Sequence, residues 1–369
     1  MLQRKNVKFV RDKKFRLRAS VALVYKNKIL NLFKTNVRES INIEINFDNI
    51  IELLLHFNGK KTVKEIAKEF EIELETLEKL VVFLNKKFVL IEEDYKYDDE
   101  LIRNKYRIIN FLEDYCYKTS EVFKKLQEVK NKRILIIGLG AVGTWIADMV
   151  ARNGIEKFIL VDDDKVELSN LHRQHLYFED DIGKQKTECV KNRLLEINDN
   201  IEVITINKKI DEEFFNDFTF DCDLVVNCAD YPSVDYTTKI VGKYCMKHNI
   251  PHIVGGGYNL HLTLIGQTII PYKTACYECF NLRLQEINKP FVNGVKKLHR
   301  KTRKIGSFAP LSTIAASLSA LDIFKILYGL EEYIVNSSKR IEFSILEKDF
   351  KIMKIDKNKK CKVCSYNGN

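Results

Sequence analysis

Two Cys-x-x-Cys pairs, Cys276–Cys279 and Cys361–Cys364, are the residues whose type and spacing point most clearly to chemistry. Each pair places two sulfur ligands on one tight turn, which is half of a tetrahedral zinc site. Disulfide bonds are the alternative, but two such pairs in a chain without an export signal favour a metal. Because four thiolates fill the coordination shell and leave no position for water, we expect a structural Zn²⁺ that fastens the C-terminal tail.

The other five cysteines are scattered, and several lie in apolar runs where a small hydrophobic side chain is expected. We expect a buried, reduced thiol at Cys116, Cys189, Cys222, Cys228 and Cys245. No cysteine lies between Phe280 and Lys360, so the stretch between the two zinc-binding pairs contains no thiol nucleophile.

A second set of residues is suited to binding a nucleotide. The apolar run Arg133–Ile137 predicts a buried strand, and Gly138, Gly140 and Gly143 follow it in a G-x-G-x-x-G pattern that opens a helix. Glycine permits the tight turn, and the N–H groups at the start of the helix attract phosphate. The next apolar run ends in Asp162, where a carboxylate can accept hydrogen bonds from ribose hydroxyl groups. These features predict the mononucleotide-binding half of a Rossmann-like fold.

Composition and charge argue against several classes of protein. The 369 residues are 45% hydrophobic and carry a net charge of +10, from 61 Lys and Arg against 51 Asp and Glu. This excess is mixed with acidic residues, and its densest patches, 4–18 and 296–304, lack interleaved aromatic side chains, so we expect no nucleic-acid partner. Without an apolar N-terminal segment or an uncharged apolar run of about eighteen residues, we expect a cytoplasmic protein with no membrane contact.

The order of the elements predicts two domains joined by a connector. Residues 131–369 alternate apolar runs with helical segments, which indicates an α/β domain with a Rossmann-like, mostly parallel sheet and a zinc-binding tail. Residues 95–130 are charged and helical in pattern, as expected for a connector. Residues 1–94 are expected to form a small α+β module.

Within residues 1–94, strand and helix patterns follow one another in the order of a winged-helix module. Thr62 is the expected N-cap of the second helix, with Glu65 three residues later completing a capping box. The expected strands are 20–25, 41–45 and 88–91, and the expected helices are 48–55, 62–67 and 75–86. Such a module binds either DNA or a peptide, and a peptide-modifying domain behind it would favour the peptide.

The residues after Asp162 determine which nucleotide-binding family the chain is similar to. The run 162–174, D-D-D-K-V-E-L-S-N-L-H-R-Q, resembles the signature of the ThiF/MoeB family, the adenylating enzymes related to ubiquitin-activating enzymes. Further matches follow in the same order at 183–187, 225–230 and 308–310, and both cysteine pairs belong to the same pattern. The resemblance covers residues 130–369.

The resemblance implies roles for individual residues. The residues implied to bind the nucleotide are Gly138, Gly140, Gly143, Asp162, Asn170, Arg173 and Lys186, and Asp230 is implied to bind Mg²⁺. When a carboxylate attacks the α-phosphate of ATP, negative charge builds on the bridging oxygens. Positioned Arg, Lys and Mg²⁺ stabilise that charge, so the enzyme needs no nucleophile of its own.

Family members also complete their site with an arginine from a partner subunit, located upstream of the glycine loop. Arg107 is the candidate here, and Arg103 is the second choice. We therefore expect a homodimer whose catalytic residues are Asn170, Arg173, Lys186, Asp230 and the partner's copy of Arg107.

Two features distinguish the branches of this family. The absence of a cysteine between the zinc-binding pairs argues against thioester or persulfide chemistry. The N-terminal module resembles the PqqD-like recognition elements of enzymes that modify ribosomal peptides, in which a peptide adds a strand to the sheet edge. The whole order is similar to the peptide nucleotidyltransferases that make microcin C-type antibiotics.

That branch implies a reaction of ATP, or of CTP in some relatives, with a short precursor peptide that ends in asparagine. The product carries a stable P–N bond. The alternatives are a MoeB-like enzyme that activates the Gly-Gly end of a sulfur-carrier protein, and a non-catalytic peptide-binding scaffold. Intact Arg173, Lys186 and Asp230 argue against the scaffold.

Overall fold

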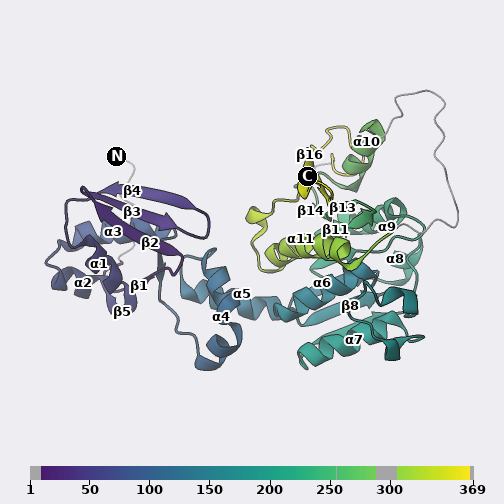
Figure 1. The fold of residues 1–369 in the computed structure, drawn as a ribbon, viewed down its shortest axis with the longest axis horizontal. Coiled ribbons are helices and arrows are strands. Elements are labelled where there is room, and N and C mark those ends of the chain that lie inside the picture. Colours follow the sequence, from purple (N-terminus) through teal and green to yellow (C-terminus); the bar gives the residue numbers. More distant parts are fainter. Residues whose placement is uncertain (1–9, 255, 288–305, 366–369) are drawn as a thin grey trace. The chain divides into compact units, whose positions relative to one another are not determined.

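The computed structural model describes residues 10–254, 256–287 and 306–365 of the chain. The chain divides into two compact units, Met1–Gln127 and Glu128–Asn369, which are described in turn (Figure 1). Among the described residues, the first unit contains two small antiparallel sheets, and the second contains a large mixed sheet and a smaller antiparallel one.

The N-terminal unit has two three-stranded sheets. The first, in the order β2-β3-β4, consists of β2 (Val21–Lys26), β3 (Ile29–Lys34) and β4 (Glu39–Glu44). The second, in the order β5-β1-β6, consists of β5 (Asn58–Thr62), β1 (Lys14–Leu17) and β6 (Leu90–Glu92). The strand predicted at 88–91 therefore forms, but it pairs with β1 and does not extend the first sheet.

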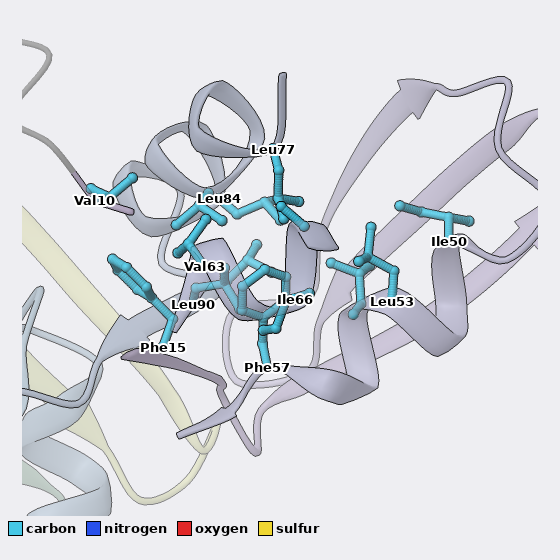
Figure 2. Packing of buried hydrophobic residues seen from close by; sticks show 14 of the residues in the cluster. Val10, Phe15, Ile50, Leu53, Phe57, Val63, Ile66, Leu77, Leu84 and Leu90 are labelled. Carbon is cyan, nitrogen blue, oxygen red and sulfur yellow. The ribbon is translucent and has the colours of Figure 1, made fainter. Parts of the chain in front are cut away.

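Three helices cover these sheets and build one apolar core. They are α1 (Ile50–His56), α2 (Val63–Glu69) and α3 (Leu74–Lys86). The predicted capping box is confirmed, because the Thr62 side chain accepts from Glu65 N while the Glu65 carboxylate accepts from Thr62 N. Figure 2 shows Phe15, Phe57 and Leu84 among the side chains of this core, where each is at most 2% exposed.

The residues of the predicted helical connector form two helices, α4 (Asp99–Glu113) and α5 (Thr119–Lys130). Arg18, which is only 3% exposed, donates to the backbone oxygens of Glu113 and Cys116. Arg16 pairs with the Glu113 carboxylate and that of Glu93. A buried guanidinium that lost these acceptors would be left uncompensated, so the contacts hold the end of α4 firmly against the segment containing β1.

The C-terminal unit contains a six-stranded sheet in the order β14-β11-β10-β7-β8-β9. Its strands are β7 (Arg133–Ile137), β8 (Lys157–Val161), β9 (Glu202–Ile206), β10 (Leu224–Asn227), β11 (His252–Val254) and β14 (Gln267–Ile269). Five strands are parallel, and β14 alone in this sheet is antiparallel. The predicted α/β fold with a mostly parallel sheet is confirmed.

Helices flank this sheet, and they are α6 (Ala141–Arg152), α7 (Lys186–Ile197), α8 (Phe214–Asp217), α9 (Val234–Lys247), α10 (Tyr277–Ile287) and α11 (Ala309–Leu327). Short 3-10 turns lie at Leu168–Asn170, Glu179–Asp181 and Glu331–Tyr333. Helix α11 packs along α6 and is long and apolar enough to span a membrane by length and composition. Half of its apolar stretch is buried, and a core helix of a globular protein meets the same criterion.

A second, antiparallel sheet in this unit has the order β12-β13-β15-β16. Its strands are β12 (Gly257–Asn259), β13 (Leu262–Leu264), β15 (Lys339–Ser344) and β16 (Asp349–Lys354). The last two strands form the β-like tail that the sequence predicts after Leu330, and the second cysteine pair follows them. This arrangement returns the tail to the body of the unit.

Candidate active site

The carboxyl ends of β7, β8 and β10 meet at one edge of the large sheet. Strand β7 is central, β8 and β9 lie on one side of it, and β10 and β11 lie on the other. The strand order therefore reverses direction between β7 and β10, and ligands of open α/β sheets bind at such a switch point. The predicted nucleotide residues follow these three strands in the chain.

The glycine loop after β7 is shaped by close backbone contacts. Gly138 has φ +90°, and a Cβ there would lie 2.6 Å from Ala229 N. A Cβ on Gly143 would lie 2.0 Å from the Gly138 oxygen, so neither position accepts a side chain without a shift. Gly140 differs, because nothing lies within 4 Å of the place where its Cβ would be. That open side, at the N-cap of α6, is where a phosphate can approach the backbone.

Asp162 at the end of β8 is held by the backbone around it. Its carboxylate accepts from Leu139 N at 2.6 Å and from Asp164 N at 2.9 Å. Burial raises the pKa of Asp162 above its ordinary value, although the Lys186 cation acts in the opposite direction. The side chain is therefore fixed to the glycine loop, and its role in ribose binding stays a prediction.

Lys186 begins α7 and is the most deeply buried of the predicted cations, with 5% of its surface exposed. Its Nζ lies 2.7 Å from the Asp164 carboxylate, and its backbone N–H donates to the Asp164 oxygen at 3.1 Å. A buried ammonium with one exposed carboxylate partner is a strong anion-binding group at a helix N-terminus. Lys186 and Asp162 are thus brought to the same edge of the sheet.

Asn170 and Arg173 lie on one turn after β8. Asn170 is 7% exposed, and its Oδ1 accepts from Glu167 N at 3.0 Å. Arg173 is half-buried, and its Nη1 donates to the Ser169 oxygen at 2.6 Å. Lys165 pairs with Gln185 across this turn, so the turn is fastened to the strand-like segment that precedes Lys186.

Asp230 follows β10 and is exposed. The backbone before it is fixed by Cys228 N, which donates to the Ile137 oxygen at 2.6 Å and ties the end of β10 to the glycine loop. Burial raises the pKa of the Cys228 thiol to about 12, so this cysteine stays protonated at neutral pH. Asp230 is therefore an accessible carboxylate at the same edge as the cations, and a carboxylate oxygen is a suitable ligand for Mg²⁺.

Arg107 is not among the residues that the C-terminal unit brings together. It is exposed on α4 of the N-terminal unit, where its Nε donates to the Tyr106 hydroxyl at 2.6 Å. Its guanidinium carbon lies 5.0 Å from the centre of the Tyr106 ring. The role of Arg107 in a partner's site stays a prediction.

The four cysteines of the two pairs converge in one buried cluster, with every sulfur within 4.8 Å of the others. The sulfur–sulfur distances are 3.9 Å for Cys276–Cys279, 3.6 Å for Cys276–Cys361 and 3.4 Å for Cys279–Cys364. A disulfide needs about 2.05 Å, whereas four sulfurs about 2.3 Å from a tetrahedral Zn²⁺ are about 3.8 Å apart. The cluster therefore fits a zinc ion and does not form disulfides.

The protonation chemistry of this cluster agrees with a metal. Burial raises the pKa of Cys276, and it raises that of Cys364 to about 12, whereas at Cys361 burial is outweighed by backbone hydrogen bonds, which lower its pKa. Thiols in such surroundings ionise only when a cation compensates them, and a bound Zn²⁺ does so. Two backbone groups, Asn358 N and Val363 N, also donate to the sulfurs of Cys279 and Cys361.

No feature of the sequence indicates a role for two buried residues near the site, Tyr177 and Gln174. Tyr177 is buried, and its hydroxyl donates to the Leu139 oxygen at 2.8 Å, which braces the glycine loop. Gln174 is 4% exposed, and its Oε1 lacks a hydrogen-bond partner in the described structure. Gln174 is the last residue of the 162–174 signature and Tyr177 lies three residues after it, and neither residue type indicates a role until the positions of the loops are known.

Comparison with known proteins agrees with this geometry. The sequence profile of the ThiF family matches residues 117–363. The sulfur carrier protein ThiS adenylyltransferase of Escherichia coli is 30% identical over 205 residues, which cover 56% of this chain and 76% of that protein. The molybdopterin-synthase adenylyltransferase of Escherichia coli is 28% identical over 245 residues, covering 66% and 90%.

A solved structure resembles more of the chain than these relatives do. The crystal structure of E. coli MccB with ATP superposes with a TM-score of 0.75 and 26% identity, covering 95% of this chain and 99% of that one. The family profile spans well over half of the present sequence, including the sheet edge with Asp162, Lys186 and Asp230. The chain therefore belongs to the ThiF family and is an adenylyltransferase.

Proposed function

We propose that this enzyme transfers a nucleotide from ATP or CTP to a short ribosomal peptide, activating the carboxylate of a C-terminal asparagine and forming a P–N-linked nucleotidyl peptide. The observation that carries the proposal is the extent of the likeness to MccB. It covers 95% of this chain and so includes the N-terminal unit, whereas the ThiS adenylyltransferase and the molybdopterin-synthase adenylyltransferase match 56% and 66%. An N-terminal unit shared with MccB favours a shared class of substrate.

Related crystal structures contain the reactants that such an enzyme needs. Structures of MccB have been solved with ATP, with MccA, with N-formylated MccA of the microcin C7 system, and with a succinimide. These ligands belong to MccB. We transfer their class to the present chain because 25–26% identity and a TM-score near 0.75 extend across both units.

The first proposed step is attack by the peptide carboxylate on the α-phosphate. A new oxygen–phosphorus bond forms, the bond from the α-phosphorus to the bridging oxygen breaks, and pyrophosphate leaves with its electron pair. Asn170, Arg173 and Lys186 hold the triphosphate and stabilise the leaving charge, and Asp230 would hold a Mg²⁺ that neutralises it further. The side-chain amide nitrogen of the asparagine then attacks the activated carbonyl, which expels the nucleoside monophosphate and closes a succinimide. The succinimide nitrogen loses its proton and attacks the α-phosphate of a second triphosphate, which forms the P–N bond and releases a second pyrophosphate.

The N-terminal unit, which we interpret as a PqqD-like winged-helix module, provides a free strand edge for the peptide. Ile45 N donates to the Lys28 oxygen across the β3–β4 pair at 2.8 Å. Because hydrogen-bonding direction alternates along an antiparallel strand, the N–H groups of Ser40, Asn42 and Glu44 point away from β3. β4 is an edge strand of its sheet, so an extended peptide can add there.

Two further assignments belong to this proposal. The site is completed in a homodimer, with Arg107 reaching the partner's triphosphate, since a planar guanidinium suits phosphate. The four-cysteine cluster binds a structural Zn²⁺, which ties the C-terminal tail to α10 and takes no part in the transfer.

Intact mass spectrometry tests the reaction. The full chain is incubated with Mg²⁺, ATP or CTP, and short peptides that end in asparagine, with aspartate-ended peptides as matched controls. A stable gain of one nucleoside monophosphate on the asparagine peptides alone is expected, and the added mass identifies the base. No gain on any of the peptides, while a Gly-Gly carrier is adenylated, would overturn the proposal.

A MoeB-like enzyme for a sulfur-carrier protein is the second candidate. It is favoured by the relatives named above, which are adenylyltransferases for a sulfur carrier and for molybdopterin synthase. The same experiment with a ubiquitin-like carrier ending in Gly-Gly decides between the two candidates, because only one substrate class gains the nucleotide. A non-catalytic scaffold would modify neither of them.

A further inference from the structure

One contact reaches across the sheet edge between loops that the proposed reaction does not use. Lys209 follows β9, Tyr231 follows β10, and the Lys209 Nζ lies 3.3 Å from the centre of the Tyr231 ring. Strands β7 and β8 lie between β10 and β9 in the sheet. The two loops therefore start three strand spacings apart, or about 14 Å, and their side chains meet across the ends of the strands that carry the glycine loop and Asp162.

The two partners differ in how they are held. Tyr231 is 65% exposed, next to the proposed magnesium ligand Asp230, so its ring is presented to solvent. Lys209 is also exposed, but the loop before it is anchored by Asn207, whose Oδ1 accepts a hydrogen bond from the Thr187 hydroxyl. Tyr231 is thus an accessible aromatic face beside a nucleotide site, with one cation on it.

The nucleobase of a bound nucleotide is a suitable partner for an exposed aromatic ring at this edge of the sheet. Every nucleobase presents a π-face, and stacking on an exposed aromatic side chain contributes substantially to nucleotide affinity. An ammonium over an exposed ring is held only weakly, so another flat ring can displace it. Asp162 lies at the end of β8, between the strands that precede Lys209 and Tyr231, so a base attached to a ribose there is within reach of Tyr231.

We propose that Tyr231 stacks on the nucleobase of the bound triphosphate, and that the Lys209 ammonium yields this ring face to the base. Stacking depends on the flat face of the base and not on its hydrogen-bonding groups, so Tyr231 contributes to the binding of both ATP and CTP. The inference rests on the proposed function, because it takes the ribose and triphosphate positions from it, and it adds the base-binding residue.

Nucleotide binding by the full chain, measured by calorimetry without peptide, tests this assignment. We expect Tyr231→Ala to weaken ATP and CTP at least about fivefold while Tyr231→Phe, which keeps the ring, stays within about twofold. Tripolyphosphate, which has no base, should bind wild type and Tyr231→Ala equally. Lys209→Met should bind ATP at least as tightly as wild type does.

Lys208→Met is the matched control for Lys209. Lys208 is the preceding residue, but it pairs with Asp217 and lies over Phe218. The Lys208→Met substitution should therefore leave nucleotide affinity unchanged. Because Tyr231 is exposed and Lys208 is half-buried, neither change removes a fully buried side chain, and thermal melts verify folding.

The outcomes separate this inference from the proposed function. The base assignment is overturned if Tyr231→Ala leaves ATP affinity unchanged, or if it weakens tripolyphosphate to the same degree. It is also overturned if Lys209→Met weakens ATP as much as Tyr231→Ala does. Failure of the wild type to bind either nucleotide would instead overturn both the function and this inference.

Discussion

The two units use their sheets in opposite ways. In the N-terminal unit, β4 is an edge strand whose outward backbone groups are free for a new strand. In the C-terminal unit, β7, β8 and β10 each have a strand on both sides, so their backbone groups are consumed within the sheet. Only the residues beyond the strand ends are available there. Under the proposed function, this difference divides the work between the units. The N-terminal unit would bind an extended peptide through backbone groups, and the C-terminal unit would carry out the chemistry through side chains and glycine-loop amides.

The largest expected effect is a loss of nucleotidyl transfer with no change in peptide affinity. We expect Asp230→Ala to lower kcat about a thousandfold, because a lost Mg²⁺ removes several kcal/mol of stabilisation from the leaving pyrophosphate. Nucleotidyl transfer is measured by mass spectrometry, and peptide affinity by calorimetry. Asp221→Ala, which changes an exposed carboxylate before the same strand, is the control and should stay fully active. Activity in Asp230→Ala would show that another group holds the metal.

The second effect concerns the stability of the C-terminal unit. Cys361→Ser should abolish stoichiometric zinc and lower the stability of this unit by several kcal/mol, since metal binding contributes directly to folding. Zinc content and thermal unfolding measure the two changes. Cys222→Ser, at a cysteine outside the cluster, should retain the metal. Full zinc occupancy in Cys361→Ser would contradict the assignment of this ligand.

A change at β4 tests the other half of the comparison. Asn42→Pro removes an outward N–H without touching the β3–β4 ladder, and edge strands tolerate proline. We expect the KM for peptide to rise about tenfold, the effect of about 1.4 kcal/mol, with kcat unchanged at saturation. Asn42→Ala loses the same side chain, including its bond to Asn31, but keeps the N–H and should bind peptide normally. Equal defects in both variants would remove β4 as the docking edge.

The last effect concerns stability alone and is a difference in acid sensitivity between the units. His252 on β11 is 1% exposed, and burial lowers its pKa to about 4. Between about pH 6.5 and 4, the unfolded chain binds a proton that the folded chain does not, so stability falls as pH falls by up to about 3 kcal/mol. Above pH 6.5 the effect is absent, because both states are neutral. His56 is the only histidine in residues 1–127, and it is half-buried.

The measurement is the pH dependence of unfolding, followed separately in each unit by hydrogen exchange. His252→Leu should flatten the decline between pH 6.5 and 4 in the C-terminal unit, whereas His248→Leu, at an exposed position, should not. An unchanged slope in His252→Leu would show that other groups dominate the acid response.

Local patterns predicted much of this arrangement. The glycine loop, the strand that ends at Asp162 and the Thr62 capping box each depend on residues close in sequence, and each forms as expected. Strand β5 was missed because Asn58–Thr62 is polar and lies beside a helix start. It becomes a strand by pairing with β1, more than forty residues earlier in the chain. Such a tertiary pairing overrides local propensity.

The site residues divide in the same way. The order of Asp162, Lys186 and Asp230 along the chain predicts a shared sheet edge once the strands are assumed to be parallel. Predicting the Lys209–Tyr231 contact requires the order of the strands as well, because the contact depends on β10 and β9 lying on opposite sides of β7. No periodicity or motif specifies that order, so the contact could not be predicted from these residues alone.

The four-cysteine cluster also imposes an order on biosynthesis. Its second pair is translated more than eighty residues after the first, so the cluster cannot close until residue 364 has left the ribosome. Residues 1–127 are complete long before then, by roughly 10 to 50 s at ordinary rates of translation. If β4 binds the peptide as proposed, a nascent chain would present this edge before its adenylation unit is complete, and a peptide bound to it early would not yet be consumed.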